Sequence, residues 1–433
     1  MSRSLKVVIE KVVYGGRGMG RVGGKVVFVP FTLPGERVEA EVTREKRDYV
    51  EAVLKRVEQR SPLRIDPFCR LFQECGGCQY QHLPYPEQLK LKEAVLKDTL
   101  GPLIRKAPLE LHPILPSPQD RGYRIRAQLK AGREGGRPVL GFYAWKTHRI
   151  VDVEECPLLH PLANRILAGL RNRMGQGSLF SIRGADIQVS PEAGEGVVHV
   201  RGEGPWHPRA VEEIGKKIPG VKGMVVKEKP EASWGELTLS YDWPEFLGRE
   251  GLHIRTSGAS FFQVNPYQNW NLMRKVVEGA GLTGGEKVLD LFCGSGNLTL
   301  PLAQRARQVW GIDQDRQAID HAAANARRNN LNNCRFIAAS AEEGMRLAFR
   351  EAQGVEVVVL DPPRSGAPAV LDRLAASRPS KVLYISCEPP TLVRDLNRLA
   401  ELGYKVERIQ PLDMFPQTYH VEVIAECRWR NAG

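Results

Sequence analysis

The sequence predicts an α/β protein in three parts: a small β-barrel over residues 1–60, a central α+β domain over 61–260, and a doubly wound, Rossmann-like domain over 261–433. The chain has 433 residues, more than a single hydrophobic core usually holds. Its first part alternates β-branched runs with glycine turns, and its last part alternates apolar strands with helical runs. These patterns are typical of a barrel and of a parallel sheet covered by helices.

The first part is short, basic and punctuated by glycine. The stretch "KVVIEKVVYGGRGMGRVGGKVVFVP" separates β-branched runs with Gly pairs, and "PGERVEAEVTREKRDYVEAVLKRV" continues with alternating apolar and polar residues. Residues 1–60 carry 13 Lys or Arg and 8 acids, a net charge of +5. A basic five-stranded pattern of this kind favours an oligonucleotide-binding barrel, although such barrels also occur as structural modules.

The central part begins with a cysteine cluster and a helix predicted over "PYPEQLKLKEAVLKDTL", where Leu89, Leu96 and Leu100 recur at helical spacing. Strands follow that we expect to pair antiparallel: "IRAQLKA", "VLGFYAW", "ADIQVS", "GVVHVRG", "GMVVKEK" and "ELTLSY". Residues 121–149 carry 8 Lys or Arg and 1 acid, with aromatic residues between them. Cations bind phosphates and aromatic faces stack on unpaired bases, so this stretch favours an RNA surface over a core face with basic flanks.

The last part contains the apolar strands of the predicted parallel sheet. They are "EKVLDLFCGSG", "QVWGID", "CRFIAAS", "VEVVVLDPP", "KVLYISC", "YKVERIQPLDMF" and "HVEVIAECRW". Near-continuous Val, Ile and Leu runs indicate strands that are buried on both faces. Ligands bind at the carboxyl ends of such strands.

Charge and composition restrict the class of partner and the compartment. The chain carries 62 Lys or Arg against 50 acids, a net charge of +12, which favours a polyanion as partner. It has neither an apolar stretch of about 18–20 residues for a membrane span nor a signal-peptide core at its start. We therefore expect a cytoplasmic protein, monomeric and without a membrane partner, whose eight cysteines are thiols, metal ligands or catalytic groups.

A glycine turn between a strand and a helix marks the predicted cofactor site. In "VLDLFCGSGNLTLPLA", Gly294 and Gly296 allow the backbone to approach a ligand. Asp313 follows Gly294 by 19 residues and ends the next strand, where an acid binds ribose hydroxyls. A nicotinamide dinucleotide is the rival ligand, but its fingerprint places Gly or Ala where this chain has Thr299. The turn instead resembles motif I of S-adenosylmethionine-dependent methyltransferases.

Two residues at strand ends suggest how a pyrimidine would be methylated. Asp361 in "VVVLDPPRSG" and Cys387 in "KVLYISC" follow neighbouring strands, so we expect both in one crevice. A thiolate that adds to carbon 6 of a pyrimidine activates carbon 5 toward a methyl group. A base must then remove the carbon 5 proton, and Glu422 in "QTYHVEVIAEC" is the candidate, with His420 as its rival.

A second set of cysteines has the spacing of a metal site. Cys69, Cys75 and Cys78 lie in "CRLFQECGGC", and Cys156 in "EECPL" is the candidate fourth ligand. Four thiolates suit either zinc or an iron–sulfur cluster. We interpret Cys293, Cys334 and Cys427 as structural thiols.

The motifs around these residues are long enough to suggest a family. "LYISCEPPTLVRDL" and "MFPQTYHVE" resemble the signatures of RNA 5-methyluridine methyltransferases, most closely the RumA-type 23S rRNA (uracil-5-)-methyltransferases. The resemblance spans nearly the whole chain, and the N-terminal barrel resembles the TRAM module of RNA-modifying enzymes. It implies that Cys387 is the nucleophile and Glu422 the base.

The resemblance also implies two cofactors and their ligands. It implies a [4Fe-4S] cluster on the four cysteines. S-adenosylmethionine would be bound by Gln263, Phe292, Gly294, Gly296, Asn297, Asp313, Asp361 and Ser340, the last at the position of a polar contact to the adenine.

The implied activity is methylation of one uridine in 23S rRNA, with the target base flipped out of its stack. Phe261 or Phe262 would stack on that base, and Arg124 and Arg126 would contact phosphate or uracil. A uridine in the T-loop of tRNA is the alternative substrate, although enzymes acting there commonly lack the barrel and the cluster. A catalytically inactive RNA-binding iron–sulfur protein is an alternative of another class. A DNA cytosine methyltransferase is disfavoured, since its nucleophile usually follows a proline where this chain has Asp361.

Overall fold

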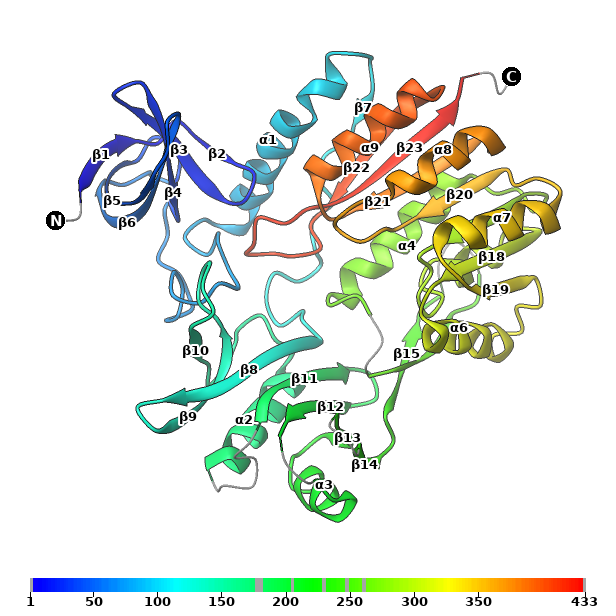
Figure 1. Cartoon of the computed structure of the whole chain (residues 1–433), viewed down its shortest axis with the longest axis horizontal. Coiled ribbons are helices and arrows are strands. Elements are labelled where there is room, and N and C mark those ends of the chain that lie inside the picture. Colours follow the sequence, from blue (N-terminus) through cyan, green and yellow to red (C-terminus); the bar gives the residue numbers. More distant parts are fainter. Residues whose placement is uncertain are drawn as a thin grey trace.

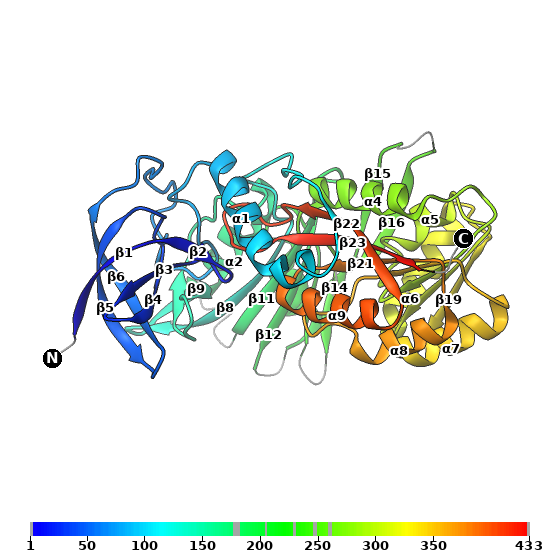
Figure 2. The same cartoon turned by 90° about the horizontal axis from the view of Figure 1, so that it is seen from above.

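A computed structural model of the chain describes residues 3–175, 182–203, 206–227, 231–245, 249–258 and 262–430. In the described part, the strands form a six-stranded N-terminal sheet, a seven-stranded central sheet, a two-stranded ribbon and an eight-stranded C-terminal sheet. Figure 1 shows the N-terminal sheet beside the C-terminal sheet, with the central sheet below both, and Figure 2 shows the N-terminal sheet at one end of the molecule.

The N-terminal sheet has the strand order β1-β5-β6-β4-β3-β2. Its strands are β1 (Ser4–Val8), β2 (Lys11–Val13), β3 (Arg17–Val22), β4 (Lys25–Pro30), β5 (Arg37–Glu45) and β6 (Tyr49–Gln59). It has six strands where the sequence indicated five, because the chain bends between β1 and β2. There the Ile9 N–H donates to the Glu36 carbonyl and the Glu10 N–H donates to the Met19 carbonyl, both at 2.8 Å. Alternate residues such as Val27, Val29 and Val38 fill its core.

The central sheet has the order β10-β9-β8-β11-β12-β13-β14. Its strands are β8 (Arg126–Glu134), β9 (Arg137–Tyr143), β10 (Ile150–Asp152), β11 (Ile182–Ser190), β12 (Glu195–Gly202), β13 (Val221–Val226) and β14 (Ala232–Gly235), and its helices are α2 (Pro161–Gly175) and α3 (Pro208–Gly215). The expectation of antiparallel pairing is wrong at one point: β12 and β13 run parallel. They do so because α3 lies between them in sequence and returns the chain to the end of the sheet at which β12 begins.

The ribbon of β15 (Thr238–Trp243) and β16 (Leu252–Ser257) leads from the central sheet to the C-terminal sheet. The latter has the order β19-β18-β17-β20-β21-β23-β22-β7. Its strands are β17 (Lys287–Leu291), β18 (Gln308–Asp313), β19 (Cys334–Ala338), β20 (Val357–Leu360), β21 (Lys381–Ser386), β22 (Tyr404–Leu412), β23 (Glu422–Trp429) and β7 (Glu110–Leu111). The five strands from β19 to β21 are parallel, whereas β23 runs antiparallel to both of its neighbours.

Helices cover both faces of the C-terminal sheet, as its near-continuous apolar strands predict. They are α4 (Pro266–Ala280), α5 (Thr299–Ala303), α6 (Arg316–Arg328), α7 (Ala341–Ala352), α8 (Pro368–Ser377) and α9 (Pro389–Glu401). On β17 the side chains alternate between two cores: Val288 packs with residues of α4 and α5, and Leu289 and Leu291 pack with residues of α7, α8 and α9. The carboxyl ends of β17, β18, β20 and β21 therefore form one edge that the helices leave accessible.

One helix from the middle of the chain packs against the C-terminal domain. Helix α1 (Tyr85–Ile104) begins after Pro84 and buries Leu96, Leu100 and Leu103 in the core shared with α9. The short strand β7 then extends the C-terminal sheet beyond β22. Among the described residues, no helix is long and apolar enough to cross a membrane.

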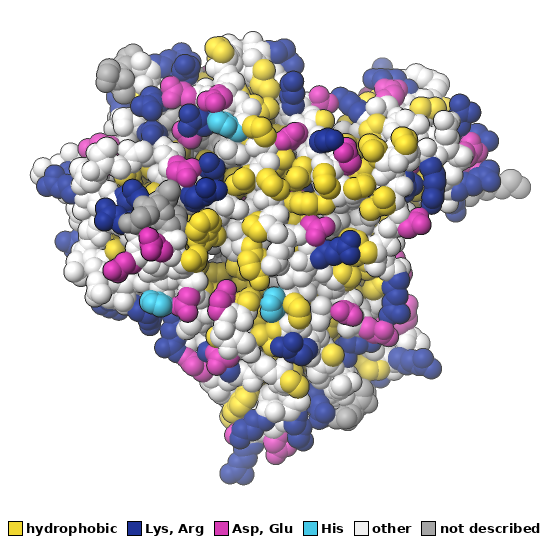
Figure 3. All heavy atoms as spheres, turned by 180° about the vertical axis from the view of Figure 1, so that it is seen from behind, with side chains coloured by type: hydrophobic (Ala, Val, Ile, Leu, Met, Phe, Trp, Pro, Cys, Tyr) yellow, Lys and Arg dark blue, Asp and Glu magenta, His cyan; other side chains and the backbone are white. Residues whose placement is uncertain are grey.

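Basic side chains are widely distributed. On the face opposite that of Figure 1, Lys and Arg are scattered with Asp and Glu between them, and apolar side chains gather toward the middle (Figure 3). On that face the Lys and Arg side chains are therefore spread rather than concentrated in one patch.

Candidate active site

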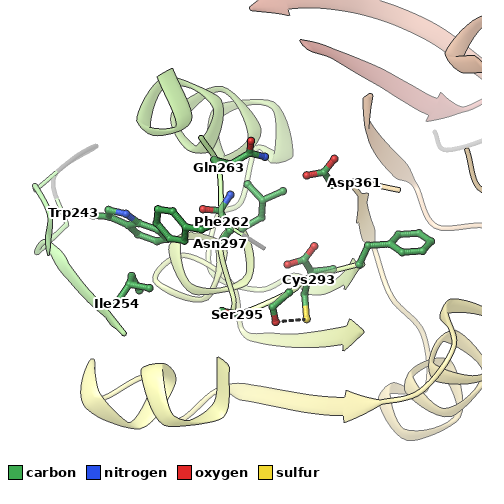
Figure 4. Close-up of a pocket in the computed structure, with 12 residues that line it drawn as sticks. Trp243, Ile254, Phe262, Gln263, Cys293, Ser295, Asn297 and Asp361 are labelled. Atoms are coloured by element: carbon green, nitrogen blue, oxygen red, sulfur yellow. Dashed lines mark hydrogen bonds between the residues drawn. The ribbon is translucent and has the colours of Figure 1, made fainter. Parts of the chain in front are cut away.

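A cavity opens where the glycine turn leaves the carboxyl end of β17. Phe292, Gly294 and Gly296 have φ values of 65°, 53° and 95°, in the left-handed region. A Cβ on Gly294 would meet no atom within 4 Å, so the backbone of the turn is open to a ligand. The cavity is lined by Trp243, Ile254, Phe262, Gln263, Asp290, Phe292, Cys293, Gly294, Ser295, Asn297, Leu298 and Asp361 (Figure 4).

Most of the predicted cofactor residues meet at this cavity. Gln263, Phe292, Gly294, Asn297 and Asp361 line it. In Figure 4, Asp361 lies across the cavity from Trp243, Ile254 and Phe262. The amide of Asn297 exchanges two hydrogen bonds of 2.8 and 3.0 Å with Asn269 of α4, which fixes its orientation.

The other three predicted cofactor residues lie around the turn rather than in the lining. Asp313 ends β18, and its carboxylate accepts hydrogen bonds from the Gly294 N–H at 3.0 Å and the Asp315 N–H at 2.9 Å. Gly296 packs on α5, where a Cβ would lie 3.1 Å from Leu300. Ser340 is exposed, and its hydroxyl accepts a bond of 3.3 Å from the Glu343 N–H, capping α7.

Carboxyl groups crowd this cavity without a cationic side chain in its lining. Asp290 is 1% exposed, and its Oδ2 accepts a hydrogen bond of 2.5 Å from the Thr299 hydroxyl. Burial, together with the charges of Asp361 and Asp313, raises the pKa of Asp290 to about 7. Burial raises the pKa of Asp361 to about 6. A ligand that carries positive charge would relieve this repulsion.

Cys387 and Glu422 lie side by side at the same edge of the sheet. Cys387 follows β21 and Glu422 begins β23, and the antiparallel register pairs Ser386 with Val423. Cys387 is half-buried, whereas Glu422 is 4% exposed. Burial raises the pKa of the Cys387 thiol to about 11, with further increases from the charges of Glu422 and Asp361.

Asp361 connects this pair to the cavity. Cys387 is not part of the cavity lining, but Asp361 lines the cavity and interacts electrostatically with both Cys387 and Glu422. Burial, and next the charge of Asp361, raises the pKa of Glu422 well above its ordinary value. A higher pKa makes the Glu422 carboxylate a stronger base.

Arg364 opposes the carboxylates. It follows the Asp361–Pro362–Pro363 turn, is exposed, and lowers the pKa of both Cys387 and Glu422 by its charge. Burial, then the positive charge of Arg364, lowers the pKa of His420 to about 3. His420 is therefore neutral and a weak base, and its low pKa favours Glu422 as the proton acceptor.

The four predicted metal-binding cysteines line a different cavity. Cys69, Cys75, Cys78 and Cys156 share a cavity of about 650 Å³ with Arg124, Arg126, Arg364 and Phe415, among other residues. Burial raises the pKa of Cys75 to about 11 and that of Cys78 to about 12, and the charge of Cys156 raises both further. The described residues contain no group of three or more His, Cys, Asp or Glu side chains placed to hold a metal ion. The structure thus brings the four thiols to one cavity without showing a metal site.

Comparison with known proteins places the chain in a family. Residues 246–425 match the family model described as tRNA (Uracil-5-)-methyltransferase, and residues 3–55 match the TRAM domain. The chain is 34% identical to an uncharacterized RNA methyltransferase of Halalkalibacterium halodurans, over 99% of this chain and 97% of that protein. The chain belongs to the RNA (uracil-5-)-methyltransferase family. Further relatives are uncharacterized RNA methyltransferases of Caldanaerobacter subterraneus (33%, 97% of both chains) and Thermosynechococcus vestitus (35%, 98% of this chain and 97% of that protein).

A solved structure is similar over the whole length of this RNA (uracil-5-)-methyltransferase. It is the Pyrococcus abyssi tRNA (uracil-54, C5)-methyltransferase in complex with S-adenosyl-L-homocysteine, with a TM-score of 0.74 and 28% identity. The match covers 98% of this chain and 100% of that chain. The predicted α/β methyltransferase fold and the N-terminal TRAM domain are confirmed.

Three of the four residues predicted to contact RNA are described by the structure, and they line two cavities. Arg124 and Arg126 line the cysteine cavity, where Arg124 Nε lies 3.5 Å from the Tyr123 hydroxyl. Phe262 is 5% exposed and lines the cavity at β17, stacked on Tyr241 with ring centroids 4.2 Å apart. Phe261 lies outside the described residues.

An open groove lies between the TRAM domain and the central domain. It measures about 830 Å³ and includes Arg17 of β3, residues 142–148 and Tyr419. Tyr143 is 38% exposed, with the Lys130 ammonium 5.3 Å from its ring centroid. Tyr419, at one end of this lining, interacts electrostatically with Cys387.

Sequence reasoning missed two charged residues of the site. Asp290 lies within the apolar strand "VLDLF", where an acid is unusual and could have been noticed. Arg364 lies in "LDPPRSG", but its neighbours Cys387 and Glu422 are distant in sequence, so only the fold brings the three together.

Proposed function

We propose that this family member methylates carbon 5 of a uridine in RNA, with S-adenosyl-L-methionine as the methyl donor. The observation that carries the proposal is the pairing of β21 with β23, which puts a thiol and a buried carboxyl side by side. Asp361 interacts with both groups and also lines the cavity beneath the glycine turn. A nucleophile, a base and a donor site within reach of one another are what carbon 5 methylation of a pyrimidine requires.

The cavity at β17 fits this donor. Its crowded carboxyl groups favour a cationic ligand, and the sulfonium and amino groups of S-adenosylmethionine are cationic. We assign Asp313 to the ribose hydroxyls, and Asp290 and Asp361 to the charged end. Gln263, Phe292, Gly294, Gly296 and Asn297 would enclose the ligand, and Ser340, just past β19 on the same edge, would contact the adenine.

The first step belongs to Cys387. Its sulfur forms a bond to carbon 6 of the uracil, and the electron pair of the carbon 5–carbon 6 double bond moves toward the carbon 4 carbonyl to give an enolate. When bound, S-adenosylmethionine would supply an electrophilic methyl group: carbon 5 bonds to the methyl as the methyl–sulfonium bond breaks, which leaves S-adenosylhomocysteine. Arg364 assists because its charge lowers the pKa of the Cys387 thiol and favours the thiolate.

The second step belongs to Glu422. Its carboxylate takes the proton from carbon 5, the double bond to carbon 6 re-forms, and the bond from carbon 6 to the Cys387 sulfur breaks. The enzyme is then free, with the proton on Glu422 and the thiolate restored.

We propose that Cys69, Cys75, Cys78 and Cys156 hold a [4Fe-4S] cluster. The support is that four thiols share one cavity and that, after burial, the charge of Cys156 raises the pKa of Cys75 and Cys78, a repulsion that iron would neutralise on binding thiolates. Methyl transfer needs no redox step, so the cluster would serve the fold of the central domain, for which we propose residues 61–260.

We further propose that RNA follows the groove between the TRAM domain and residues 142–148. The exposed ring of Tyr143 beside Lys130 provides a stacking face with a nearby cation, which is the arrangement single-stranded nucleic acid favours. The target base would be flipped out toward Cys387, with Arg124 and Arg126 contacting phosphate or uracil. Phe261 or Phe262 would stack on the flipped base.

Separate observations favour two RNA substrates. The TRAM domain together with the cysteine set favours 23S rRNA, as the sequence resemblance implies. The Pyrococcus abyssi tRNA (uracil-54, C5)-methyltransferase matches 98% of this chain, and this favours uridine in the T-loop of tRNA. We propose 23S rRNA first and tRNA second, with a monomeric, cytoplasmic enzyme in either case.

One experiment tests the function and separates the substrates. The purified protein is incubated with methyl-labelled S-adenosylmethionine and total RNA from cells that lack the gene, and 5-methyluridine is mapped in 23S rRNA and tRNA. Label in 23S rRNA supports the first substrate, and label only in tRNA supports the second. Tight RNA binding without label would instead identify an inactive RNA-binding protein, and a Cys387→Ser variant that still methylates would contradict the covalent mechanism.

A further inference from the structure

A buried ion pair joins α1 to the segment 413–421, which precedes Glu422. The Lys92 ammonium lies 2.6 Å from Asp413 Oδ1, and both side chains are 0% exposed. The two residues are far apart in sequence, so the pair ties the middle of the chain to the end of the catalytic sheet. Burying a charged pair costs desolvation energy that its mutual attraction often fails to repay.

The Lys92 ammonium also organises the backbone of this segment. It donates to the Phe415 carbonyl at 3.1 Å and to the His420 carbonyl at 3.0 Å. With the bond to Asp413, its three N–H groups have three acceptors. Buried carbonyls need donors, and here one cation satisfies carbonyls near both ends of the segment and thereby fixes the distance between them.

A second set of buried contacts holds the middle of the same segment. Gln417 has a φ of 70°, an uncommon conformation for a residue other than glycine. Its carbonyl accepts from the Gln79 and Tyr80 N–H groups at 2.9 and 3.0 Å. Its side chain and backbone exchange two bonds with the Gln88 amide at 2.8 and 3.1 Å. Gln88 and Lys92 lie one turn apart on α1, so a single helix face carries both contacts.

We propose that Lys92 and Asp413 form a buried clamp that positions Glu422 for proton removal from carbon 5. His420, whose carbonyl Lys92 binds, lies two residues before Glu422. Asp413 directly follows Leu412, which is the register partner of Glu422 across β22 and β23. The clamp thus connects the end of β22 to the start of β23, next to Glu422. This inference rests on the proposed function and makes Lys92 a positioning residue rather than a catalytic one.

The clamp should affect one chemical step more than the others. A misplacement of about 1 Å at a reacting group can cost about 100-fold in rate. Cys387 lies between β21 and α9, outside the clamped segment, so bond formation to carbon 6 should continue when the clamp is lost. Proton removal by Glu422 should slow, and the methylated covalent RNA–enzyme adduct should accumulate.

The test compares two paired variants of the full-length protein. Lys92→Met with Asp413→Asn removes both charges, because removing one alone would strand its partner and could unfold the protein. The matched control is Arg64→Met with Glu36→Gln, which removes another buried pair, with side chains 7% and 0% exposed and an N–O distance of 2.5 Å. That pair joins the segment after β6 to the N-terminal sheet.

Each protein is mixed with S-adenosylmethionine and an unmethylated transcript of an RNA that the wild type methylates, then quenched in denaturant at set times. We expect decay of the adduct to slow by about 10- to 100-fold in the clamp variant, with adduct formation near the wild-type rate. Glu422→Gln should show the same accumulation, and the control pair should not. Amide hydrogen exchange should rise across 413–421 only in the clamp variant.

The outcomes separate the clamp from the function on which it rests. If the wild type turns over and the clamp variant accumulates no more adduct than the control pair, the clamp is wrong and the proposed function stands. Slower adduct formation without accumulation would likewise overturn it, since that result assigns Lys92 a general structural role. If the earlier mapping of 5-methyluridine finds no RNA that the wild type methylates, the proposed function is overturned, and the role of the clamp with it.

Discussion

The acidity of Cys387 gives a direct test of how the site is activated. Burial raises its pKa from an ordinary 9.0 to about 11, with Glu422 and Asp361 adding to the effect. At pH 8 a thiol with a pKa of 11 is about one part in 1,000 thiolate, against about one part in 10 at a pKa of 9. We therefore expect alkylation of Cys387 in the free enzyme to be about 100-fold slower than that of an ordinary thiol.

The methyl donor should reverse this suppression through its charge. A unit positive charge on the order of 8 Å from the thiolate, at an effective dielectric constant of about 20, contributes about 2 kcal/mol. That energy corresponds to about 1.5 pKa units, or about 30-fold in thiolate population. S-adenosylhomocysteine fills the same site without the sulfonium charge, so it serves as the matched control ligand.

The assay is peptide-resolved alkylation with iodoacetamide from pH 7 to 10, with the free enzyme and with each ligand. We expect the Cys387 rate to rise about tenfold per pH unit in the free enzyme, because the pH stays below the pKa. S-adenosylmethionine should accelerate the reaction and S-adenosylhomocysteine should not, while Arg364→Met should slow it in all three states. A free-enzyme rate that levels off below pH 9, or equal acceleration by both ligands, would refute this account of activation.

Three further predictions concern the groove, the donor cavity and the cysteine set. Tyr143→Ala should weaken RNA binding by about 5- to 150-fold, which corresponds to about 1–3 kcal/mol of stacking per base, while Tyr143→Phe should keep the affinity. Anisotropy with labelled RNA measures the affinity of both variants, and an equal loss in the two would count against stacking. Lowering the pH from 8 to 5 protonates Asp290 and Asp361, whose pKa values are about 7 and about 6. Calorimetry should therefore show that S-adenosylmethionine loses more affinity than S-adenosylhomocysteine. Parallel losses would contradict a role for carboxylate charge. Cys78→Ser should lose iron and acid-labile sulfide while Cys334→Ser retains them, and a Cys78 variant with full iron content would exclude it as a ligand.

Local patterns in the sequence were sufficient to predict the C-terminal sheet. Val288, Leu289 and Leu291 are apolar because β17 is covered by helices on both faces, so the run itself reveals a buried parallel strand. The turn after β17 was predictable from its glycines, because the φ values of Gly294 and Gly296 are those that glycine adopts readily. Among the residues that line the cavity at β17, the local patterns predicted Gly294 and Asp361, whereas Gln263, Phe292 and Asn297 were implied by the family resemblance.

Contacts between distant segments were not predictable in this way. Lys92 sits on an amphipathic helix where a lysine would ordinarily be exposed, and only the fold places it against Asp413. Arg124, predicted to contact RNA, shares a cavity with the four cysteines, and its neighbours in sequence do not indicate this position. The parallel pairing of β12 with β13 depends on α3, which no periodicity in the strands reveals.

The position of Glu422 shows how one reversal of chain direction builds the site. In a parallel sheet, the residues at the ligand-binding edge come from the ends of strands, as Asp361 and Cys387 do. Glu422 begins its strand, and had β23 run parallel to β21, that edge would receive residues near Trp429 instead. Because β23 is antiparallel, its first residue emerges beside the last residues of β21. Glu422 and Cys387, the proposed base and nucleophile, therefore meet only because β23 enters the sheet against the direction of the other strands.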